Sequence, residues 1–501
     1  MLELAIICVV SAIAWLYLVV AHGGFWLTGQ RLPSVRESVA SPGEVASPGE
    51  KEEPGASRSP TAKASPAVAM DPGENGELGV VLDPGTWPTV AAVVPARNEA
   101  DSLPMTLPGL LAQDYPGEFC VFLVDDNSDD GTGAIAAALG EKAARRGGAP
   151  LTVVNGRPRP DGWAGKVWAM AQGLAVATRT ADEILEANRG AGVGKADGVA
   201  EAGGSAGTEA AVWAAESDAA MVAAGAYPAA GVRATLPVGA PPEYVLFTDA
   251  DISWAPTALR GLVQGAEADD RALLSQMALL RAETRWERVI VPAFVYFFAQ
   301  LYPFRKVSDP KSGIAAAAGG CMLVRRSALE AAGGLEPIRD ALIDDVALGA
   351  LLKKHGSRIW LGLTTDIRSA RPYPSLASLW HMIARSAYVQ LRYNPLLLVG
   401  TIIGLLLLYV APPAGAITAL IGIAVGTAGT PVAVAGLAGL AGWALMTASY
   451  VPMLRLYRLS ALRAPTLPLI AVLYATMTAD SARRHYSGRS VSWRGRTADR
   501  V

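Results

Sequence analysis

Long apolar runs at both ends of the chain constrain its fold more than any other feature. Residues 2–21 are nearly uncharged, and about 20 apolar residues suffice for a helix to cross the roughly 30 Å hydrocarbon core of a bilayer. The chain turns apolar again after Asn394. The candidate spans of that region are 395–411, 414–428, 432–453 and 464–479. With 51% hydrophobic and 18% charged residues, we expect a mixed protein, part globular and part membrane-embedded.

The distribution of arginine predicts the orientation of the first apolar run. Arg31 and Arg36 follow this run, and no Lys or Arg precedes it. Positive charge favours the cytoplasmic side of a span, so we expect the chain that follows to lie in the cytoplasm. The missing basic n-region and the length of the run also argue against the competing interpretation, a cleaved signal peptide.

The C-terminal charges leave the number of spans open. Arg455, Arg458 and Arg463 precede the last apolar run, and six further arginines follow it. Both groups favour the cytoplasm, but they would lie on opposite sides if 464–479 crossed the bilayer. Either this segment is re-entrant or interfacial, or the first group violates the rule. Three or four C-terminal segments are compatible with the sequence.

The region between the apolar ends has the pattern of an α/β domain. The stretches TVAAVVPA from Thr89, FCVFLVDD at 119–126 and YVLFTDAD at 244–251 are short apolar runs typical of buried strands. Strands that alternate with helical patterns predict a mainly parallel sheet flanked by helices. Two low-complexity stretches, 25–85 and 181–240, interrupt the pattern. We expect a disordered linker at the first and a mobile insertion at the second.

Charge and cysteine content exclude other classes of protein. The 43 Lys and Arg residues against 45 Asp and Glu residues leave a net charge of −2, so no global basic field attracts nucleic acid, and we expect no nucleic-acid partner. Cys8, Cys120 and Cys321 lie far apart. They show no metal-ligand spacing and imply no disulfide framework, so we expect buried free thiols.

Charged residues follow the predicted strands where each strand ends. In open parallel sheets, ligands bind outside the carboxyl ends of the strands, so these residues should converge on one cleft. There they could contact the base, ribose and phosphates of a nucleotide. The candidate donor-binding residues are Pro95, Arg97, Glu99, Asp125, Asp126, Lys166 and Asp249. Each candidate also has a purely structural alternative. Residues 97–99 could be a polar helix start, Asp125 and Asp126 could belong to a turn that caps the next helix, and Lys166 could be a solvated lysine.

The stretch FTDADI at 247–252 places two carboxylates, Asp249 and Asp251, directly after a predicted strand. Mg²⁺ and Mn²⁺ prefer hard oxygen ligands and often bridge protein carboxylates to substrate phosphates. We therefore predict a divalent metal at these two residues. The tripeptide alone is common by chance, and its position after a strand, with the other motifs upstream, makes the prediction specific.

Further along, the chain supplies candidates for catalysis and for acceptor binding. Asp344 and Asp345 open a predicted amphipathic helix, and Asp345 is our candidate for the base that takes a proton from the acceptor hydroxyl. Carboxylates at a helix N-terminus are also simply stabilising. The candidates for contact with acceptor or diphosphate are Gly319, Gly320, Arg385, Gln390, Arg392 and Tyr393. Helix packing of the glycines and interfacial anchoring of the others are the alternatives.

The motifs PARNEA, VDDNSDDGT, FTDAD, GGCMLV and IDDVALG together resemble the family-2 glycosyltransferases over roughly residues 86–395, apart from the insertion. This resemblance implies a GT-A fold, an inverting mechanism, a nucleotide-binding Asp, a metal at Asp249 and Asp251, and Asp345 as base. Asp344 stands where that family has Glu. Where the family has Q-x-x-R-W, this chain has Gln390-Leu391-Arg392-Tyr393, which argues against processive synthesis.

A closer resemblance, through YFFAQLYPFRKVSDP at 296–310, LIDDVALG and AYVQLRYNP, is to the hopene-associated glycosyltransferases. It implies a nucleotide-sugar donor, with a UDP-sugar favoured, and a polycyclic triterpenoid lipid acceptor. It also implies a multi-pass protein of the bacterial cytoplasmic membrane whose catalytic domain faces the cytoplasm. The aromatic segment 286–304 could shape a lipid entrance at the membrane surface or pack in the core.

These expectations define an organisation and two alternatives. The expected parts are an anchor at 1–24, the linker at 25–85, a GT-A domain at 86–393 with the insertion at 181–240, membrane helices at 394–480 and a basic tail at 481–501. The alternatives to lipid glycosylation are a processive polysaccharide synthase, for which the C-terminal segments look few, and a non-catalytic scaffold. Intact Asp249, Asp251 and Asp345 argue against the scaffold.

Overall fold

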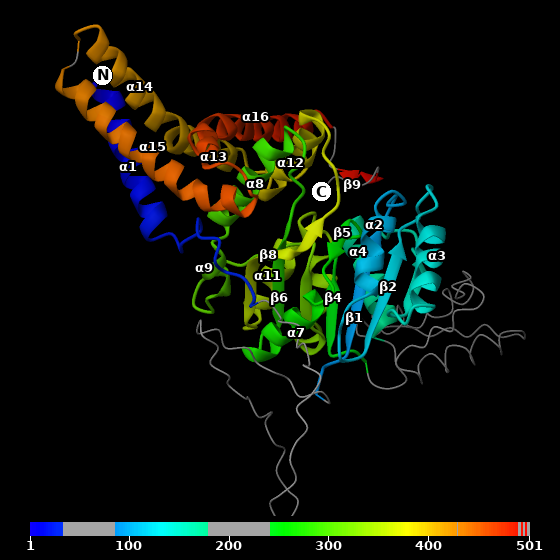
Figure 1. The fold of residues 1–501 in the computed structure, drawn as a ribbon. Coiled ribbons are helices and arrows are strands. Elements are labelled where there is room, and N and C mark those ends of the chain that lie inside the picture. The colour runs from blue at the N-terminus through cyan, green and yellow to red at the C-terminus, as the bar shows by residue number, and fades with distance from the viewer. Residues whose placement is uncertain (34–85, 179–240, 428, 489–491, 494–495, 498–501) are drawn as a thin grey trace, which may run out of the picture.

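An eight-stranded sheet forms the centre of the part of the chain that the computed structural model describes, residues 1–33, 86–178, 241–427, 429–488, 492–493 and 496–497 (Figure 1). The strands are β1 (Val90–Ala96), β2 (Phe119–Asp125), β3 (Leu151–Asn155), β4 (Tyr244–Phe247), β5 (Ile252–Trp254), β6 (Leu273–Leu279), β7 (Met322–Arg325) and β8 (Ile359–Ser369). Their order is β3-β2-β1-β4-β7-β6-β8-β5. Only β7 and β5 pair antiparallel with their neighbours in this sheet, so the predicted mainly parallel sheet is confirmed.

Alternate residues of the strands enter two hydrophobic cores, one on each face of the sheet. Ala91 and Val93 of β1 belong to the first core, and Val90, Ala92 and Val94 belong to the second. All seven residues of β1 are buried. A parallel sheet covered on both faces requires such continuous apolar runs, which is why the sequence pattern identified these strands.

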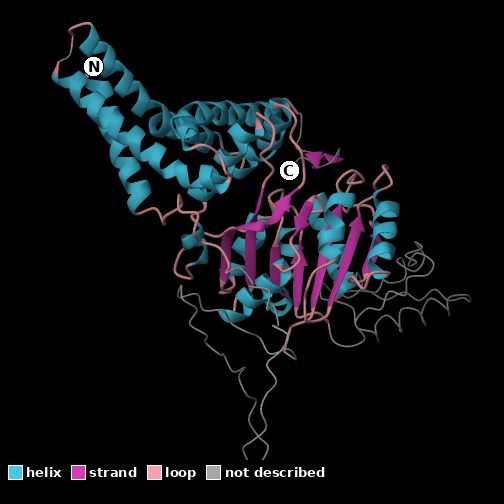
Figure 2. Ribbon diagram, viewed as in Figure 1, coloured by secondary structure: helices cyan, strands magenta, loops and turns pink. Residues whose placement is uncertain are grey.

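Helices form the layers on the two faces of the sheet (Figure 2). Side chains of α2 (Leu103–Leu111), α3 (Thr132–Ala144) and α7 (Ala258–Ala268) enter the second core. Side chains of α4 (Gly165–Ala177) and α11 (Asp344–Lys354) enter the first. The first core continues past one edge of the sheet to α8 (Glu287–Leu301), which lies with the helices beyond that edge (Figure 1). The shorter elements are α9 (Phe304–Ser308), α10 (Arg326–Ala331), η1 (Glu336–Ile338) and the ribbon of β9 (Ser492–Trp493) and β10 (Arg496–Thr497). The predicted α/β fold with apolar helices at both ends is thus observed.

The helices beyond the sheet come from both ends of the chain. They are α1 (Leu2–Val20), α12 (Leu376–Gln390), α13 (Pro395–Leu405), the π-helical η2 (Leu406–Val410), α14 (Ala411–Ala424), α15 (Thr430–Leu456), η3 (Ala461–Thr466) and α16 (Leu467–Tyr486). Within the described residues, four helical segments are long and apolar enough to cross a membrane. They are Leu2–Val20, Pro395–Ala424, Thr430–Leu456 and Ala461–Tyr486.

The structure joins two of the predicted C-terminal segments into one. Pro412 and Pro413 separate the predicted spans 395–411 and 414–428 in the sequence. In the structure, helix continues from α13 through η2 into α14. Both prolines lie in the first turn of α14, where a missing N–H does least damage to the hydrogen-bond ladder. Three C-terminal candidate segments therefore replace the predicted three or four.

Close packing joins α1, α14 and α15 into one bundle. A Cβ atom added to Gly415 of α14 would lie 2.7 Å from the carbonyl oxygen of Ala435 on α15. Small residues at such a crossing allow two backbones to approach, which is how apolar helices associate in lipid. Cys8 of α1 is buried at the same place, and Cys120 and Cys321 are also buried free thiols, as predicted.

The part of the predicted linker that is described does not behave as a free tether. Gln30 donates from Nε2 to the carbonyl oxygen of Leu361 over 2.7 Å, and its own carbonyl accepts from the N–H of Leu363 over 2.8 Å. These bonds fasten the chain after α1 to strand β8. The remaining linker residues, 34–85, and the predicted insertion at 181–240 lie outside the described residues.

Candidate functional site

The predicted site residues meet at one edge of the sheet. Strands β1, β2, β4 and β8 all end at this edge, and the antiparallel β7 begins there. In Figure 1 the edge is turned toward the helical layer that contains α8, α12 and α16. The loops that follow the parallel strands and the start of α11 bring their side chains together below these helices.

The loops after β1 and β2 bind each other. Arg97 donates from Nη1 to the carbonyl oxygen of Asp126 over 2.5 Å and lies 3.6 Å from its carboxylate. The N–H of Asn98 donates to Ser128 Oγ over 3.0 Å. Asp126 is fully buried, whereas Asp125 is half-buried and accepts from the N–H of Ser128 over 3.0 Å. Of the two acids, Asp125 is therefore the more accessible to a ligand.

Lys166 joins two of the predicted acidic motifs. Its Nζ lies 2.8 Å from Asp249 Oδ1 and 2.9 Å from Asp344 Oδ2. Burial lowers the pKa of Lys166, but the charges of Asp249, Asp344 and Asp345 outweigh burial and hold the pKa above its usual value. The lysine side chain is only 19% exposed. The interpretation of Lys166 as a solvated lysine is therefore wrong, because it is the cation at the centre of the acidic cluster.

Arg371 makes a second cationic bridge, and sequence reasoning missed it. Its Nε donates to Asp251 Oδ2 over 2.5 Å, and its Nη2 donates to Glu99 Oε1 over 2.7 Å. Burial raises the pKa of Asp251, and the Arg371 guanidinium opposes that rise. Arg371 follows the end of β8, so the rule that ligand-binding residues follow parallel strands could have identified it.

Asp345 lies beside a glycine turn that leads into β7. Its Oδ2 accepts from the N–H of Gly319 over 2.8 Å, and its Oδ1 accepts from the N–H of Val346 over 2.8 Å. Burial, together with the neighbouring Asp344 charge, raises the pKa of Asp345 to about 6, and Lys166 limits the rise. A carboxylate held in place by two N–H groups, with a pKa near neutrality, is suited to act as a general base.

Gly319 and Gly320 have different surroundings. A Cβ atom on Gly319 would lie 3.0 Å from Lys166 Nζ and 3.4 Å from Asp345 Oδ2. A Cβ atom on Gly320 would lie 3.0 Å from Ile252 Cδ1. The first glycine therefore borders the acidic cluster, and the second packs against an apolar side chain.

We expect Gly319→Ala to lower turnover by about 10-fold while the unfolding transition stays within a few degrees, because a displaced lysine or carboxylate misplaces the reacting groups. Gly320→Ala is the matched control. It should lower the thermal midpoint through overpacking against Ile252 and leave the turnover of the folded fraction near that of the unchanged protein. Steady-state kinetics and thermal unfolding of both variants measure the difference. Equal turnover in the two variants would contradict the placement of Gly319.

The predicted acceptor residues on α12 and in the turn that follows it have different surroundings. Gln390 donates from Nε2 to Tyr302 Oη, and the charge of Asp345 contributes to the raised pKa of Tyr302 after burial. Gln390 thus connects to the neighbourhood of the candidate base. Tyr393 instead stacks on His485, with ring centroids 4.4 Å apart. Arg385 and Arg392 are exposed.

The aromatic segment 286–304 packs in the core. Tyr296 is fully buried and its Oη lies 2.7 Å from Ser449 Oγ on α15. Phe297 contacts Tyr409 and Tyr474 edge to face, with centroids 5.4 and 4.7 Å apart. These contacts join α8 to the membrane helices, which favours the packing interpretation over a lipid entrance.

Asp249 and Asp251, the predicted metal ligands, each form an ion pair through one carboxylate oxygen. No cluster of three or more His, Cys, Asp or Glu side chains suited to a metal occurs within the described ranges. Asp249 pairs with Lys166 through Oδ1, and Asp251 pairs with Arg371 through Oδ2, which leaves Oδ2 of Asp249 and Oδ1 of Asp251 outside these ion pairs. Two hard oxygen donors fit a divalent ion that takes its other ligands from substrate phosphates and water.

Several solved structures are similar to the chain. One is a mannosyltransferase from Pyrobaculum calidifontis in complex with GDP-Man and Mn²⁺, with 18% identity and a TM-score of 0.43 over 84% of this chain and 91% of that one. Another is mannosyl-3-phosphoglycerate synthase from Rubrobacter xylanophilus, with 16% identity and a TM-score of 0.30 over 61% of this chain and 75% of that one. At these TM-scores neither likeness supports a conclusion about this chain. No curated protein matches it significantly.

Two family models match the chain. Glycosyl transferase family 2 matches residues 91–180, which contain the first strands and Lys166. Glycosyl transferase family 21 matches residues 238–499, which contain Asp249, Asp345, Arg371 and the C-terminal membrane helices. The second match covers more than half of the 501 residues. The chain therefore belongs to glycosyl transferase family 21.

Proposed function

We propose that the protein moves a sugar from a nucleoside-diphosphate sugar to a lipid acceptor in the membrane, with inversion at the sugar carbon. The observation that supports this most is the ion-pair cluster of Lys166 with Asp249 and Asp344, with Asp345 beside it. It combines cations for a diphosphate, carboxylates for a metal and a candidate base in one place. The sheet edge that carries the cluster is turned toward apolar helices, which supports a site next to the bilayer.

In this proposal the donor lies across the carboxyl edge of the sheet. Arg97, Glu99 and Asp125 bind the nucleotide, and we favour uracil as its base from the sequence resemblance. Lys166 and Arg371 supply positive charge to the diphosphate. A divalent metal at Asp249 and Asp251 would neutralise charge that develops on the departing diphosphate.

The reaction itself needs one proton transfer. The Asp345 carboxylate accepts the proton of the acceptor hydroxyl as that oxygen attacks the sugar carbon from the face opposite the diphosphate. With a pKa of about 6, Asp345 is mostly deprotonated at pH 7 and still basic enough to take part. The two N–H bonds to Asp345 hold it in place between Gly319 and the start of α11.

The proposed acceptor enters from the membrane side. In this proposal Gln390, Tyr302 and Arg392 orient the lipid hydroxyl. The hydrogen bond between Gln390 and Tyr302, and the charges of Asp345 and Arg392 close to Tyr302, support this role. The resemblance to the hopene-associated glycosyltransferases makes a polycyclic triterpenoid the proposed acceptor. We place the catalytic domain on the cytoplasmic side of a bacterial inner membrane, where nucleotide sugars are made.

Transfer by the purified protein tests this function and its metal requirement together. We expect labelled sugar to pass from a UDP-sugar or GDP-sugar into hopanoid-containing lipid, detected by mass spectrometry of the extracted lipid. EDTA should abolish the transfer and added Mn²⁺ or Mg²⁺ should restore it, because the metal neutralises the leaving diphosphate. Asp251→Ala should stay inactive at any metal concentration, and Asp101→Ala, an exposed acid far along the β1 loop, serves as the control. Full activity of Asp251→Ala would refute the metal site.

A further inference from the structure

Helix α16 has basic residues before and after it, and both sets favour the same side of a membrane. Arg455, Arg458 and Arg463 precede the helix, and Arg483 and Arg484 occupy its last turn. Positive charges near the ends of apolar helices stay on the cytoplasmic side. A helix that crossed the bilayer would have to place one of these sets on the wrong side.

The structure arranges α16 differently from the other long apolar helices. Helices α1, α14 and α15 pack on one another and extend together away from the sheet (Figure 1). Helix α16 packs on α12 more than on any other helix, and next on α13 and η2, and it lies across the top of the sheet domain in the same view. The axis of α16 therefore runs in a different direction from the axes of α1, α14 and α15.

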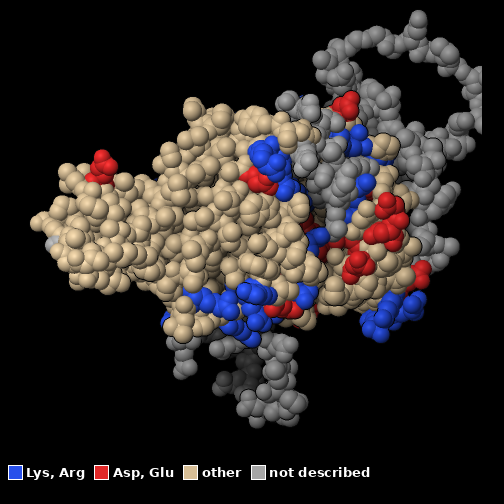
Figure 3. Space-filling view, turned by 90° about the horizontal axis from the view of Figure 1, so that it is seen from above, with Lys and Arg blue, Asp and Glu red and all other residues tan. Residues whose placement is uncertain are grey.

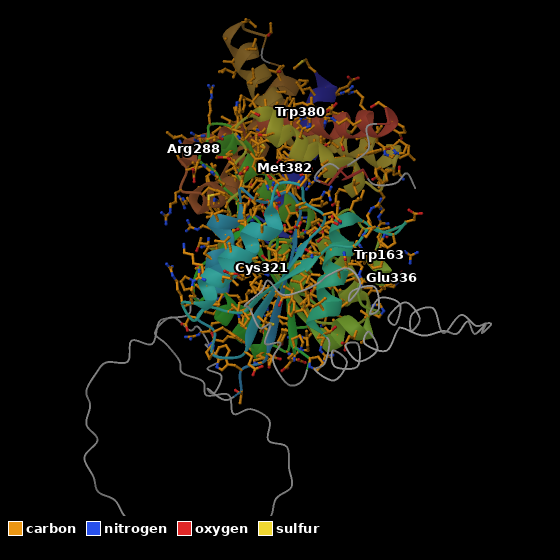
Figure 4. All side chains as sticks on the ribbon, turned by 90° about the vertical axis from the view of Figure 1, so that its right-hand side faces the viewer. Trp163, Arg288, Cys321, Glu336, Trp380 and Met382 are labelled. Atoms are coloured by element: carbon orange, nitrogen blue, oxygen red, sulfur yellow. The ribbon has the colours of Figure 1, made fainter. Side chains whose placement is uncertain are left out.

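Polar contacts fasten the second half of α16 to α12. Asp480 accepts from Trp380 Nε1 over 2.8 Å, and Ser481 Oγ accepts from the N–H of Tyr388 over 3.0 Å and donates to the carbonyl oxygen of Ala384 over 2.5 Å. Figure 4 shows Trp380 in the helical layer, above the sheet region that contains Cys321. Helix α12 begins shortly after β8 ends, so these contacts hold α16 to the sheet domain.

The exposed side of α16 forms a single stripe. Leu469, Val472, Thr476, Ala479 and Arg483 are exposed, at alternating spacings of three and four, and most residues between them are buried. This spacing places them on one face of a helix. The stripe is apolar over most of its length and ends in a cation, the pattern of a helix that lies in the plane of a membrane interface.

The degree of burial also separates α16 from the segment that is most exposed. In the most apolar stretch of Ala461–Tyr486, 50% of the residues are buried inside the protein. In the most apolar stretch of Pro395–Ala424, only 11% are buried. Leu396, Ile403 and Leu420 of the latter segment are exposed, as expected for a helix surrounded by lipid. In Figure 3 the left and central part of the surface seen from above is largely free of charge, and charged side chains gather at its borders and on the right.

We infer that α16 lies along the membrane surface, on the same side as the sheet domain, and that its exposed stripe binds the phospholipid bilayer. Leu469 and Val472 enter the acyl region, and Arg463 and Arg483 bind headgroup phosphates. The chain then crosses the bilayer three times, through α1, through α13 to α14, and through α15. This inference requires membrane insertion but is independent of sugar transfer.

Cysteine accessibility in the full-length protein tests the inference. The native cysteines are buried, so a membrane-impermeant maleimide reports added ones. Ser460→Cys and Ser487→Cys lie on either side of α16, Asp101→Cys marks the sheet domain and Thr427→Cys marks the far end of the bundle; all four positions are exposed. We expect 460, 487 and 101 to be labelled in vesicles of one orientation and 427 in the opposite one. Labelling of residue 487 in the same vesicles as residue 427 would overturn the inference. Protease protection of a tag placed after Val501 independently measures on which side of the membrane the chain after α16 lies.

A charge placed in the middle of the helix gives a second test. Thr476 lies near the centre of α16, and Leu440 lies near the centre of α15; both are exposed. Leu440→Arg should lower the amount of inserted, monodisperse protein by about 10-fold or more, because an arginine would face the hydrocarbon core. Thr476→Arg should leave that amount within about twofold, because arginine reaches the headgroups from an interfacial position. An equal loss in both variants would show that α16 crosses the bilayer.

Discussion

Replacement of Asp345 by asparagine is expected to lower kcat by about 10²- to 10⁴-fold, which is the usual contribution of a positioned general base. Asparagine has nearly the same shape and its side-chain oxygen can still accept from the N–H of Gly319, so the fold should persist. Donor binding should change little, because Asp345 acts on the acceptor hydroxyl. Turnover measured by lipid product, with donor affinity measured by calorimetry, separates the two effects.

The pH dependence of the rate of the unchanged enzyme should reflect the ionisation of Asp345. The base works when it is deprotonated, and the pKa of Asp345 is raised to about 6 by burial and by Asp344. The rate should therefore fall as pH falls below about 6 and should level off above it. Asp340→Asn, an exposed acid just before α11, is the matched control. If Asp345→Asn weakened donor binding and left kcat unchanged, the base would have to be sought elsewhere.

Replacement of Lys166 by methionine is expected to lower kcat/KM by about 100-fold and to shift the acid limb of the pH profile upward. Methionine keeps most of the side-chain length but removes the cation that lies 2.8 and 2.9 Å from Asp249 and Asp344. Three carboxylates would then face one another without compensation. Because Lys166 limits the rise in the pKa of Asp345, its loss should raise that pKa above 6, so more of the base is protonated at pH 7.

The same change should lower the free energy of unfolding by about 1–3 kcal/mol, less than for a fully buried pair because Asp249 is 36% exposed. Lys142→Met removes an exposed lysine from α3 and should change neither the pH profile nor the stability. Kinetics from pH 5 to 9 and chemical denaturation test the pair. If the acid limb of the pH profile did not shift in Lys166→Met, the charge of Lys166 would not control the pKa of Asp345.

Much of the fold follows from local patterns. The continuous apolar runs at 90–96 and 119–124 form strands that are buried because both faces of the sheet are covered. The separation of α13 from α14 was mispredicted because the sequence shows two prolines but not the π-helical turn before them. A proline disrupts a helix only where its neighbours need the missing N–H, and that need is a property of the backbone path.

The candidate site was only partly predictable. The acids at the strand ends were identified because parallel strands share a carboxyl edge. Arg371 was missed, although it pairs with both Glu99 and Asp251, because a single arginine after a strand is unremarkable in sequence. Tyr393 was grouped with the acceptor residues because of its position in a motif, and only the fold shows that its ring stacks on His485.

The sequence by itself determined which segments are apolar enough to leave water, which short runs are strands and where charged residues follow them, because these properties depend on residues close together in the chain. Tertiary structure decided which charges meet. Lys166 pairs with Asp249 and Asp344, and Arg371 with Glu99 and Asp251, because strands far apart in the chain end at the same edge. It also decided that α16 packs on α12 and not along the bundle of α1, α14 and α15. An apolar helix lowers its free energy by burial against protein or against lipid, and only the contacts around it distinguish the two.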